Sequence, residues 1–105
     1  MTREIDIETF ARMREAGAPV VDVREEYEFA QARVPGAQCI PLGELAGRLA
    51  EIGEGETVCV ICATGNRSLI GVDILAAAGR AASSVAGGTR DWLLSGRSID
   101  RGPLS

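Results

Sequence analysis

The residues best placed to do chemistry are Cys62 and Arg67, which are separated by a loop of only four residues. That loop consists of small or turn-forming residues: Ala63, Thr64, Gly65 and Asn66. We expect so short a loop to turn its backbone N–H groups inward around one point, because Gly65 can adopt a positive φ without strain. These donors and the positive end of the next helix favour an anion, so Cys62 is predicted to be a thiolate nucleophile. Arg67 would add a fixed positive charge, and Ser68 one hydroxyl donor.

Histidine is absent from the sequence, and all 11 basic residues are arginine. This composition excludes hydroxyl-histidine-carboxylate triads, histidine-ligated metals and acid-base catalysis by histidine. The nucleophile must therefore be activated by backbone dipoles and by the charge of Arg67.

The sequence contains three cysteines and no secretion signal, which favours free thiols over a disulfide framework. Cys59 and Cys62 form a CxxC string, but within an extended strand their Cα atoms lie about 10 Å apart, beyond the roughly 7 Å that a disulfide spans. We therefore interpret Cys59 as a core residue. Cys62 itself could be a buried structural thiol. However, a cysteine that only packs in the core would not need a following loop whose N–H groups point inward. Cys39 is either a small apolar filler or a thiol that resolves an oxidised Cys62.

The overall composition is that of one globular domain, with 46% hydrophobic and 25% charged residues. We expect a single domain over residues 1–105, with a core from about 5 to 99 and a loose tail after Gly96. The net charge is −4 and the acidic residues are scattered, so neither nucleic acid nor a membrane is an expected partner. No segment reaches the roughly 18 apolar residues of a membrane span, and we expect a cytoplasmic protein.

Helices and strands alternate along the predicted chain. Asp6 is a suitable N-cap for a helix from 7 to about 16. Short strands are predicted at 19–23, 38–40 and 57–61 and, with a weaker pattern, at 83–85. Apolar residues at helical spacing follow the second strand: Leu42, Leu45, Leu49 and Ile52. Further helices are predicted from about 67 to 78 and around Trp92. This alternation indicates an α/β fold, a parallel sheet with helices on both faces, and Cys62 falls where its best strand ends.

Several segments resemble the rhodanese family, in the same order and over nearly the whole chain. Residues 58–68 resemble the family's active-site strand and CxxGxRS loop. The blocks that match elsewhere are 20–25 (DVRE), 28–29, 34–37 (PGA), 40–42 (IPL) and 87–92 (GGxxxW). No single block is specific, but five in register are strong support for the resemblance.

The resemblance implies a five-stranded parallel sheet, a sulfurtransferase reaction and no metal or organic cofactor. Cys62 would take sulfur from a small anionic donor such as thiosulfate and hold it as a persulfide. A thiol or cyanide, or an acceptor protein, would then remove it. Arg67 would hold the donor, and the loop residues with Ser68 would surround it. Ala63 stands where thiosulfate-preferring members often carry a basic residue, so the preferred donor stays open.

Two other functions are compatible with the pattern. A cysteine-loop phosphatase or arsenate reductase also surrounds an oxyanion with a thiolate and an arginine, but its loop is one residue longer. A sulfur-relay or regulatory interaction module would have the same fold without small-molecule turnover.

Four further features have less specific interpretations. Asp22 and Arg24 are predicted to form a hydrogen-bonded or charge-paired fixture at the end of their strand, which Glu28 could join. We interpret Arg33 and Arg90 as solvated side chains that could also steer an anion. The pair at 87–88 is either a tight turn or one wall of the site.

Overall fold

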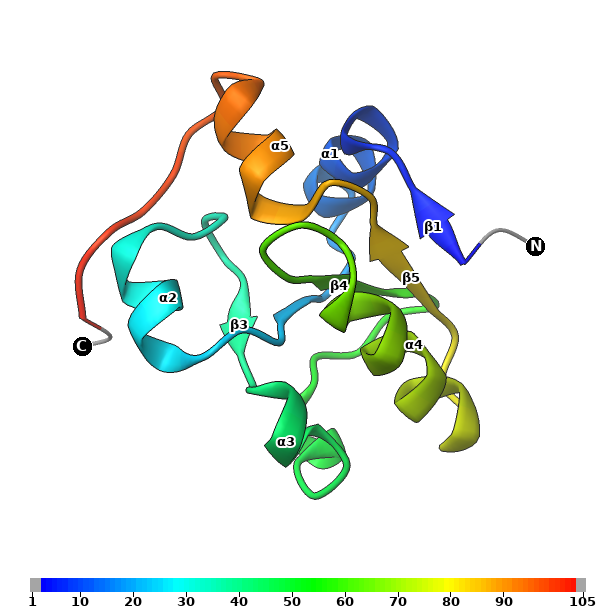
Figure 1. Ribbon diagram of the computed structural model, residues 1–105. Helices are drawn as coiled ribbons and strands as arrows, with labels where there is room; N and C mark the ends of the chain where they lie inside the picture. Colours follow the sequence, from blue (N-terminus) through cyan, green and yellow to red (C-terminus); the bar gives the residue numbers. More distant parts are fainter. Residues whose placement is uncertain (1–2, 104–105) are drawn as a thin grey trace.

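Five parallel strands form the centre of the molecule in the computed structural model, which describes residues 3–103 (Figure 1). The sheet order is β1-β5-β4-β2-β3. The strands are β1 (Glu4–Ile5), β2 (Val20–Asp22), β3 (Gln38–Cys39), β4 (Val58–Ile61) and β5 (Ala82–Val85). The fold is therefore the predicted five-stranded α/β sheet, and the limits of the four strands located in the sequence are shifted by at most one residue.

The central strand β4 positions the candidate nucleophile. It pairs with β2, where Val21 is in register with Val60, and with β5, where Ser84 is in register with the same residue. All four residues of β4 are buried. Because helices cover both faces of the sheet here, every side chain of β4 is buried, and its sequence is therefore continuously apolar.

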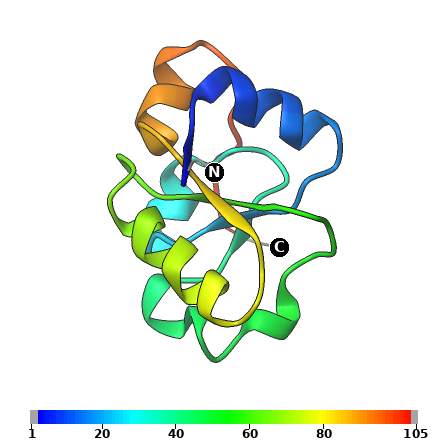
Figure 2. The same cartoon turned by 90° about the vertical axis from the view of Figure 1, so that its right-hand side faces the viewer.

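The helices cover the sheet from both faces, as Figures 1 and 2 show. On one face, α1 (Ile7–Glu15) and α5 (Gly88–Leu94) pack over Val20, Cys59 and Ile61. On the other face, α3 (Leu42–Leu45) and α4 (Arg67–Ala77) pack over Val21, Val58 and Val60. Alternate residues of β4 thus face opposite cores, as the two-residue period of a strand requires.

Two short elements were not predicted, namely β1 and the helix α2 (Glu26–Gln31) inside the polar stretch 24–32. α2 buries Phe29 and begins with a capping box, in which the Glu25 and Glu28 side chains each accept a hydrogen bond from the other residue's backbone N–H. These reciprocal bonds stabilise a helix start that has almost no apolar pattern.

The apolar repeat at 42–52 does not form one helix. The structure divides it into α3 and a 3₁₀ turn η1 (Leu49–Glu51). Gly47 lies between the two elements, and glycine weakens a helix interior by its conformational freedom.

The expectation of a loose tail after Gly96 is wrong for the described residues. Arg33 and Asp100 form an antiparallel bridge with two backbone hydrogen bonds, each 3.0 Å. The N–H of Gly102 donates to the Ala30 carbonyl at 2.8 Å, and Trp92 Nε1 donates to the Ser98 carbonyl at 2.8 Å. The segment is polar, so its sequence did not reveal that backbone groups hold it against α2 and α5.

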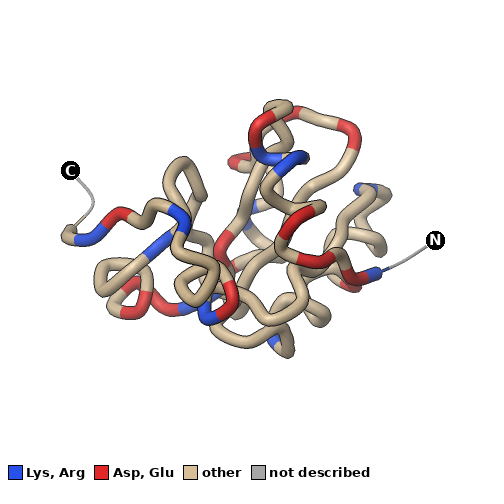
Figure 3. The backbone as a smooth tube through the Cα atoms, turned by 90° about the horizontal axis from the view of Figure 1, so that it is seen from above, with Lys and Arg blue, Asp and Glu red and all other residues tan. Residues whose placement is uncertain are grey.

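Acidic and basic residues are interspersed along the backbone (Figure 3). Across residues 3–103, no helix combines the length and apolar composition that a bilayer crossing demands.

Candidate active site

Cys62 directly follows β4, at the carboxyl edge of the sheet, and α4 begins five residues later at Arg67. The connecting loop is therefore as short as predicted. Cys62 is only 1% exposed, so its sulfur lies beneath the loop rather than on its surface. Of the other loop residues, Thr64 and Asn66 are exposed, whereas Ala63 is half-buried.

The Cys62 sulfur is surrounded by hydrogen-bond donors. The Gly65 N–H donates to Sγ at 3.1 Å, and Gly65 has a φ of 106°, the conformation for which glycine is suited. Burial raises the pKa of Cys62, but hydrogen bonds from the Ser68 hydroxyl and from the amides of Ser68, Gly65 and Thr64 bring that pKa below the value of an ordinary thiol. The loop amides thus favour a thiolate without a histidine base.

A chain of two buried hydroxyls extends from the sulfur into the sheet. Ser68 Oγ lies 3.4 Å from Cys62 Sγ, and Ser84 Oγ, on β5, lies 2.6 Å from Ser68 Oγ. Both serines are fully buried. When Cys62 is a thiolate, Ser68 must donate to it, which leaves Ser84 to donate to Ser68. No sequence pattern placed Ser84 at this site.

Arg67 is held by a residue outside the loop. Its two terminal nitrogens donate to Oε1 and Oε2 of Glu28, on α2, at 2.8 and 2.9 Å. The Arg67 hydrogen bonds lower the pKa of Glu28 to about 2, so that its carboxylate is charged at neutral pH. The sequence predicts that Arg67 holds the anionic donor, and in the structure the guanidinium is paired with Glu28.

Asp22 and Arg24 form the predicted fixture at the end of β2. Arg24 binds both carboxylate oxygens of Asp22, with contacts of 2.8 to 3.1 Å. Its guanidinium also donates to the backbone carbonyls of Glu28 and Ala32. The pair therefore attaches α2 to the sheet and brings the Glu28 side chain to the site.

The first turn of α5 packs directly on the loop. The N–H of Thr89 donates to the Cys62 carbonyl at 2.9 Å, and the N–H of Arg90 donates to the Ala63 carbonyl at 3.1 Å. A Cβ on Gly88 would lie 2.3 Å from the Cys62 carbonyl oxygen. The pair at 87–88 is thus both a tight turn and a wall of the site.

The other two cysteines lie apart from this chemistry. Cys59 is fully buried, and burial raises its pKa to about 11. Cys39 lies on β3, which β2 separates from β4, so that two strand spacings of about 5 Å intervene. Burial and the charge of Asp22 raise the pKa of Cys39 to about 11. A Cys39–Cys62 disulfide would therefore require the sheet to rearrange.

The remaining candidates contribute little that is specific. Arg33 donates to the carbonyls of Phe29 and Gly102 and so belongs to the tail contacts. Arg90 is exposed.

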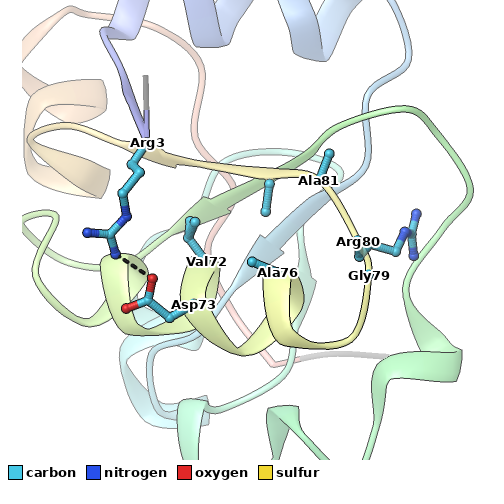
Figure 4. A pocket seen from close by; sticks show the side chains of 8 residues that line it. Arg3, Val72, Asp73, Ala76, Gly79, Arg80 and Ala81 are labelled. Carbon is cyan, nitrogen blue, oxygen red and sulfur yellow. Dashed lines mark hydrogen bonds and ion pairs between the residues drawn. The ribbon is translucent and has the colours of Figure 1, made fainter. Parts of the chain in front are cut away.

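A hollow of about 400 Å³ lies toward the opposite, N-terminal end of β5 (Figure 4), and its lining includes the Arg3–Asp73 ion pair. In residues 3–103, no three acidic, cysteine or histidine side chains gather as metal ligands would.

The arrangement can stabilise one anionic sulfur and its negatively charged adduct at the end of β4. The donors are fixed backbone amides, so they require no reorganisation as charge develops.

Comparisons with known proteins identify the family to which this fold belongs. The model of the rhodanese-like domain family matches residues 6–95. "Putative sulfur carrier protein YrkF" of Bacillus subtilis is 34% identical over 92 residues, which cover 85% of this chain and 50% of that protein. The chain spans about half the length, or less, of the curated relatives it matches.

Two solved structures show the likeness in three dimensions. A rhodanese-related protein from Thermoplasma volcanium has a TM-score of 0.85 and 30% identity, over 93% of this chain and 97% of that one. A thiosulfate sulfurtransferase from Pseudomonas aeruginosa has a TM-score of 0.86 and 29% identity, over 98% of this chain but only 21% of that one.

Proposed function

The chain belongs to the rhodanese-like domain family, and it is similar to a putative sulfur carrier protein and to a thiosulfate sulfurtransferase. From this premise we propose that it is a sulfurtransferase with Cys62 as the nucleophile. The observation that carries the proposal is the hydrogen bonding of the Cys62 sulfur to the loop amides. The thiolate is the attacking form of cysteine, and these donors favour it. Residues from about 5 to 99 would act as one sulfurtransferase domain.

In the first step, the Cys62 thiolate attacks the outer sulfur of a donor. The bond between the two donor sulfurs breaks, and its electron pair leaves with the remainder of the donor, which is sulfite when the donor is thiosulfate. Cys62 is left as a persulfide, whose terminal sulfur occupies the ring of amides from Thr64 to Ser68.

In the second step, an acceptor thiolate or cyanide attacks the terminal sulfur of the persulfide. The Cys62 thiolate is the leaving group, and its low pKa makes it a good one. The sulfur atom moves without net oxidation of the protein, and the resting enzyme is regenerated.

The proposal is tested by adding thiosulfate or an organic hydropersulfide to the protein and measuring its intact mass. We expect a gain of one sulfur atom that cyanide removes as thiocyanate. Cys62→Ser should abolish the gain, whereas Cys39→Ser, a matched change of a half-buried cysteine, should leave it intact. No sulfur on Cys62 from either donor would contradict the proposal.

The same protein sample distinguishes the two alternative functions from the sulfurtransferase. Hydrolysis of an aryl phosphate without sulfur uptake would favour the cysteine-loop phosphatase. Sulfur uptake that only a protein acceptor discharges would favour a sulfur relay, which the match to a sulfur carrier keeps in consideration.

A further inference from the structure

The cation beside Cys62 is already neutralised within the protein. Glu28 binds Arg67 through both carboxylate oxygens, and the Glu28 side chain is only 18% exposed, against 37% for Arg67. The Glu28 Oε1 atom also accepts the Glu25 N–H at 3.0 Å, as part of the capping box of α2. Glu28 is therefore fixed from two sides, and a ligand cannot displace it without uncapping a helix.

Two other described arginines near this edge of the sheet, Arg24 and Arg90, are respectively paired and exposed. Arg24 is buried and is bound by both oxygens of Asp22. Arg90, on the first turn of α5, is exposed, so water and salt screen its charge. A donor that approaches Cys62 thus meets an Arg67 whose positive charge is already offset by Glu28.

This arrangement discriminates between donors by their charge. Thiosulfate carries two negative charges, whereas a hydropersulfide with an uncharged organic group carries at most one. Because Glu28 offsets the charge of Arg67, a donor loses the attraction that an unpaired Arg67 would exert, and this loss grows with the donor's charge and with the exclusion of water. A hydropersulfide also needs no clamp for a departing sulfite.

We propose that Glu28 is a specificity-determining residue, which cancels the charge of Arg67 and thereby selects uncharged or singly charged organic hydropersulfides over dianionic donors such as thiosulfate. The inference rests on the proposed persulfide chemistry of Cys62. In the favoured reaction the Cys62 thiolate attacks the terminal sulfur of R–S–SH, the S–S bond breaks, and the electron pair leaves as RS⁻. The proton stays on the transferred sulfur, so that charge and atoms balance as Cys62–S–SH and RS⁻.

The experiment compares two donors on full-length protein under single-turnover conditions. The donors are thiosulfate and the hydropersulfide of 2-mercaptoethanol, and the readout is the rate of sulfur gain on Cys62 by intact mass. The variants are Glu28→Gln, which removes the charge but retains the shape, and Glu28→Asp, which retains the charge. Glu26→Gln, on an exposed position of the same helix turn, is the matched control.

We expect Glu28→Gln to raise the ratio of the thiosulfate rate to the hydropersulfide rate about tenfold or more. Glu28→Asp and Glu26→Gln should stay within about twofold of the wild-type ratio. A ratio that Glu28→Gln leaves unchanged or lowers overturns the inference, because Glu28 would then only position Arg67. An equal rise in Glu28→Asp also overturns it, since geometry rather than charge would be the cause.

Failure of the proposed function gives a different result. Wild-type protein would then take up sulfur from neither donor, whereas failure of this inference leaves sulfur uptake intact and changes only the ratio. Sulfite provides a second measurement that does not require turnover. It should protect Cys62 from alkylation by iodoacetamide at lower concentration in Glu28→Gln than in wild type, and equal protection would count against the inference.

Discussion

At the scale of single residues, the reactivity of Cys62 depends on hydroxyls and amides that cannot titrate at neutral pH. We predict that Ser84→Ala raises the pKa of Cys62, because Ser68 then loses the neighbour that polarises its hydroxyl. Ser68→Ala should raise that pKa further, since it removes the donor itself. The measurement is the pH dependence of alkylation by iodoacetamide. Ser83→Ala, the neighbouring change on β5, is the control and should match wild type.

The Glu28–Arg67 pair makes stability depend on pH in a defined direction. The pKa of Glu28 falls from about 4.5 in the unfolded chain to about 2 in the folded one, so the folded state favours the carboxylate. Its contribution is complete above pH 4.5 and is lost as the pH falls toward 2. We expect Glu28→Gln to cost about 1–2 kcal/mol in urea unfolding at pH 7, a value reduced for the exposure of Arg67.

The same comparison at pH 3 should show a cost less than half as large. A cost that does not change between pH 7 and pH 3 would mean that the ion pair does not account for it.

The residues of the loop could be predicted from sequence, but their partners could not. Cys62, Gly65 and Arg67 occupy a short segment whose spacing already restricts its geometry. Glu28 lies 39 residues before Arg67, and its glutamate-rich surroundings look like any solvated helix face. Ser84 belongs to a strand with a weak pattern, and only the register of β5 against β4 brings it to Ser68.

At the scale of elements, the site depends on the close approach of α5 to the loop. Gly88→Ala would place a Cβ 2.3 Å from the Cys62 carbonyl oxygen and 2.8 Å from the Ala63 carbonyl. We predict a loss of about 3 kcal/mol or more in stability, together with slower sulfur uptake, because the loop must move. Differential scanning calorimetry and the intact-mass assay measure the two effects.

Gly96 offers a matched control at the other end of the same helix. It also has a positive φ, but a Cβ there meets no atom within 4 Å. Gly96→Ala should therefore cost only the backbone strain, about 1–2 kcal/mol, and leave sulfur uptake unchanged. Equal effects at the two glycines would show that strain, not the contact with the loop, matters at Gly88.

Elements with strong local signals were predicted, and those held by distant contacts were not. The Asp6 cap is confirmed by a 2.8 Å hydrogen bond from the Thr9 N–H, and α1 ends within one residue of its expected limit. α2 was missed because its side chains are mostly polar, and β1 because two residues cannot display a period. β1 exists because Glu4 and Ile5 pair with the edge of β5.

At the scale of the whole molecule, residues 97–102 complete the structure around α2 and α5. Truncation after Gly96 would remove the Ser98 carbonyl that accepts from Trp92 and the Asp100 bridge to Arg33. Ile99, which packs against the core beneath α1 and α5, would be lost as well. We expect a fall in Tm of about 10 °C or more, measured by circular dichroism. Truncation after Pro103 is the control, and a similar fall in both would contradict a role for these contacts.

The architecture as a whole follows from alternation of strands and helices, whereas the strand order does not. Continuous apolar runs such as 57–61 indicate strands covered on both faces, and parallel strands joined by helices require crossovers. The position of β5 between β1 and β4 depends on pairings between segments far apart in the chain. Only the resemblance to a known family supplied the number of strands in advance.

The hydrogen bonds from α5 to the Cys62 and Ala63 carbonyls have a consequence for redesign. α5 has no side-chain cap, so the loop carbonyls serve as acceptors for two of its first N–H groups. The same bonds hold those carbonyls outward, which leaves the following amides free to face the sulfur. A chimera that exchanges the loop alone would separate the loop carbonyls from the α5 N–H groups that bind them. To transfer its sulfur chemistry to another scaffold, residues 62–67 and the start of α5 must be moved together.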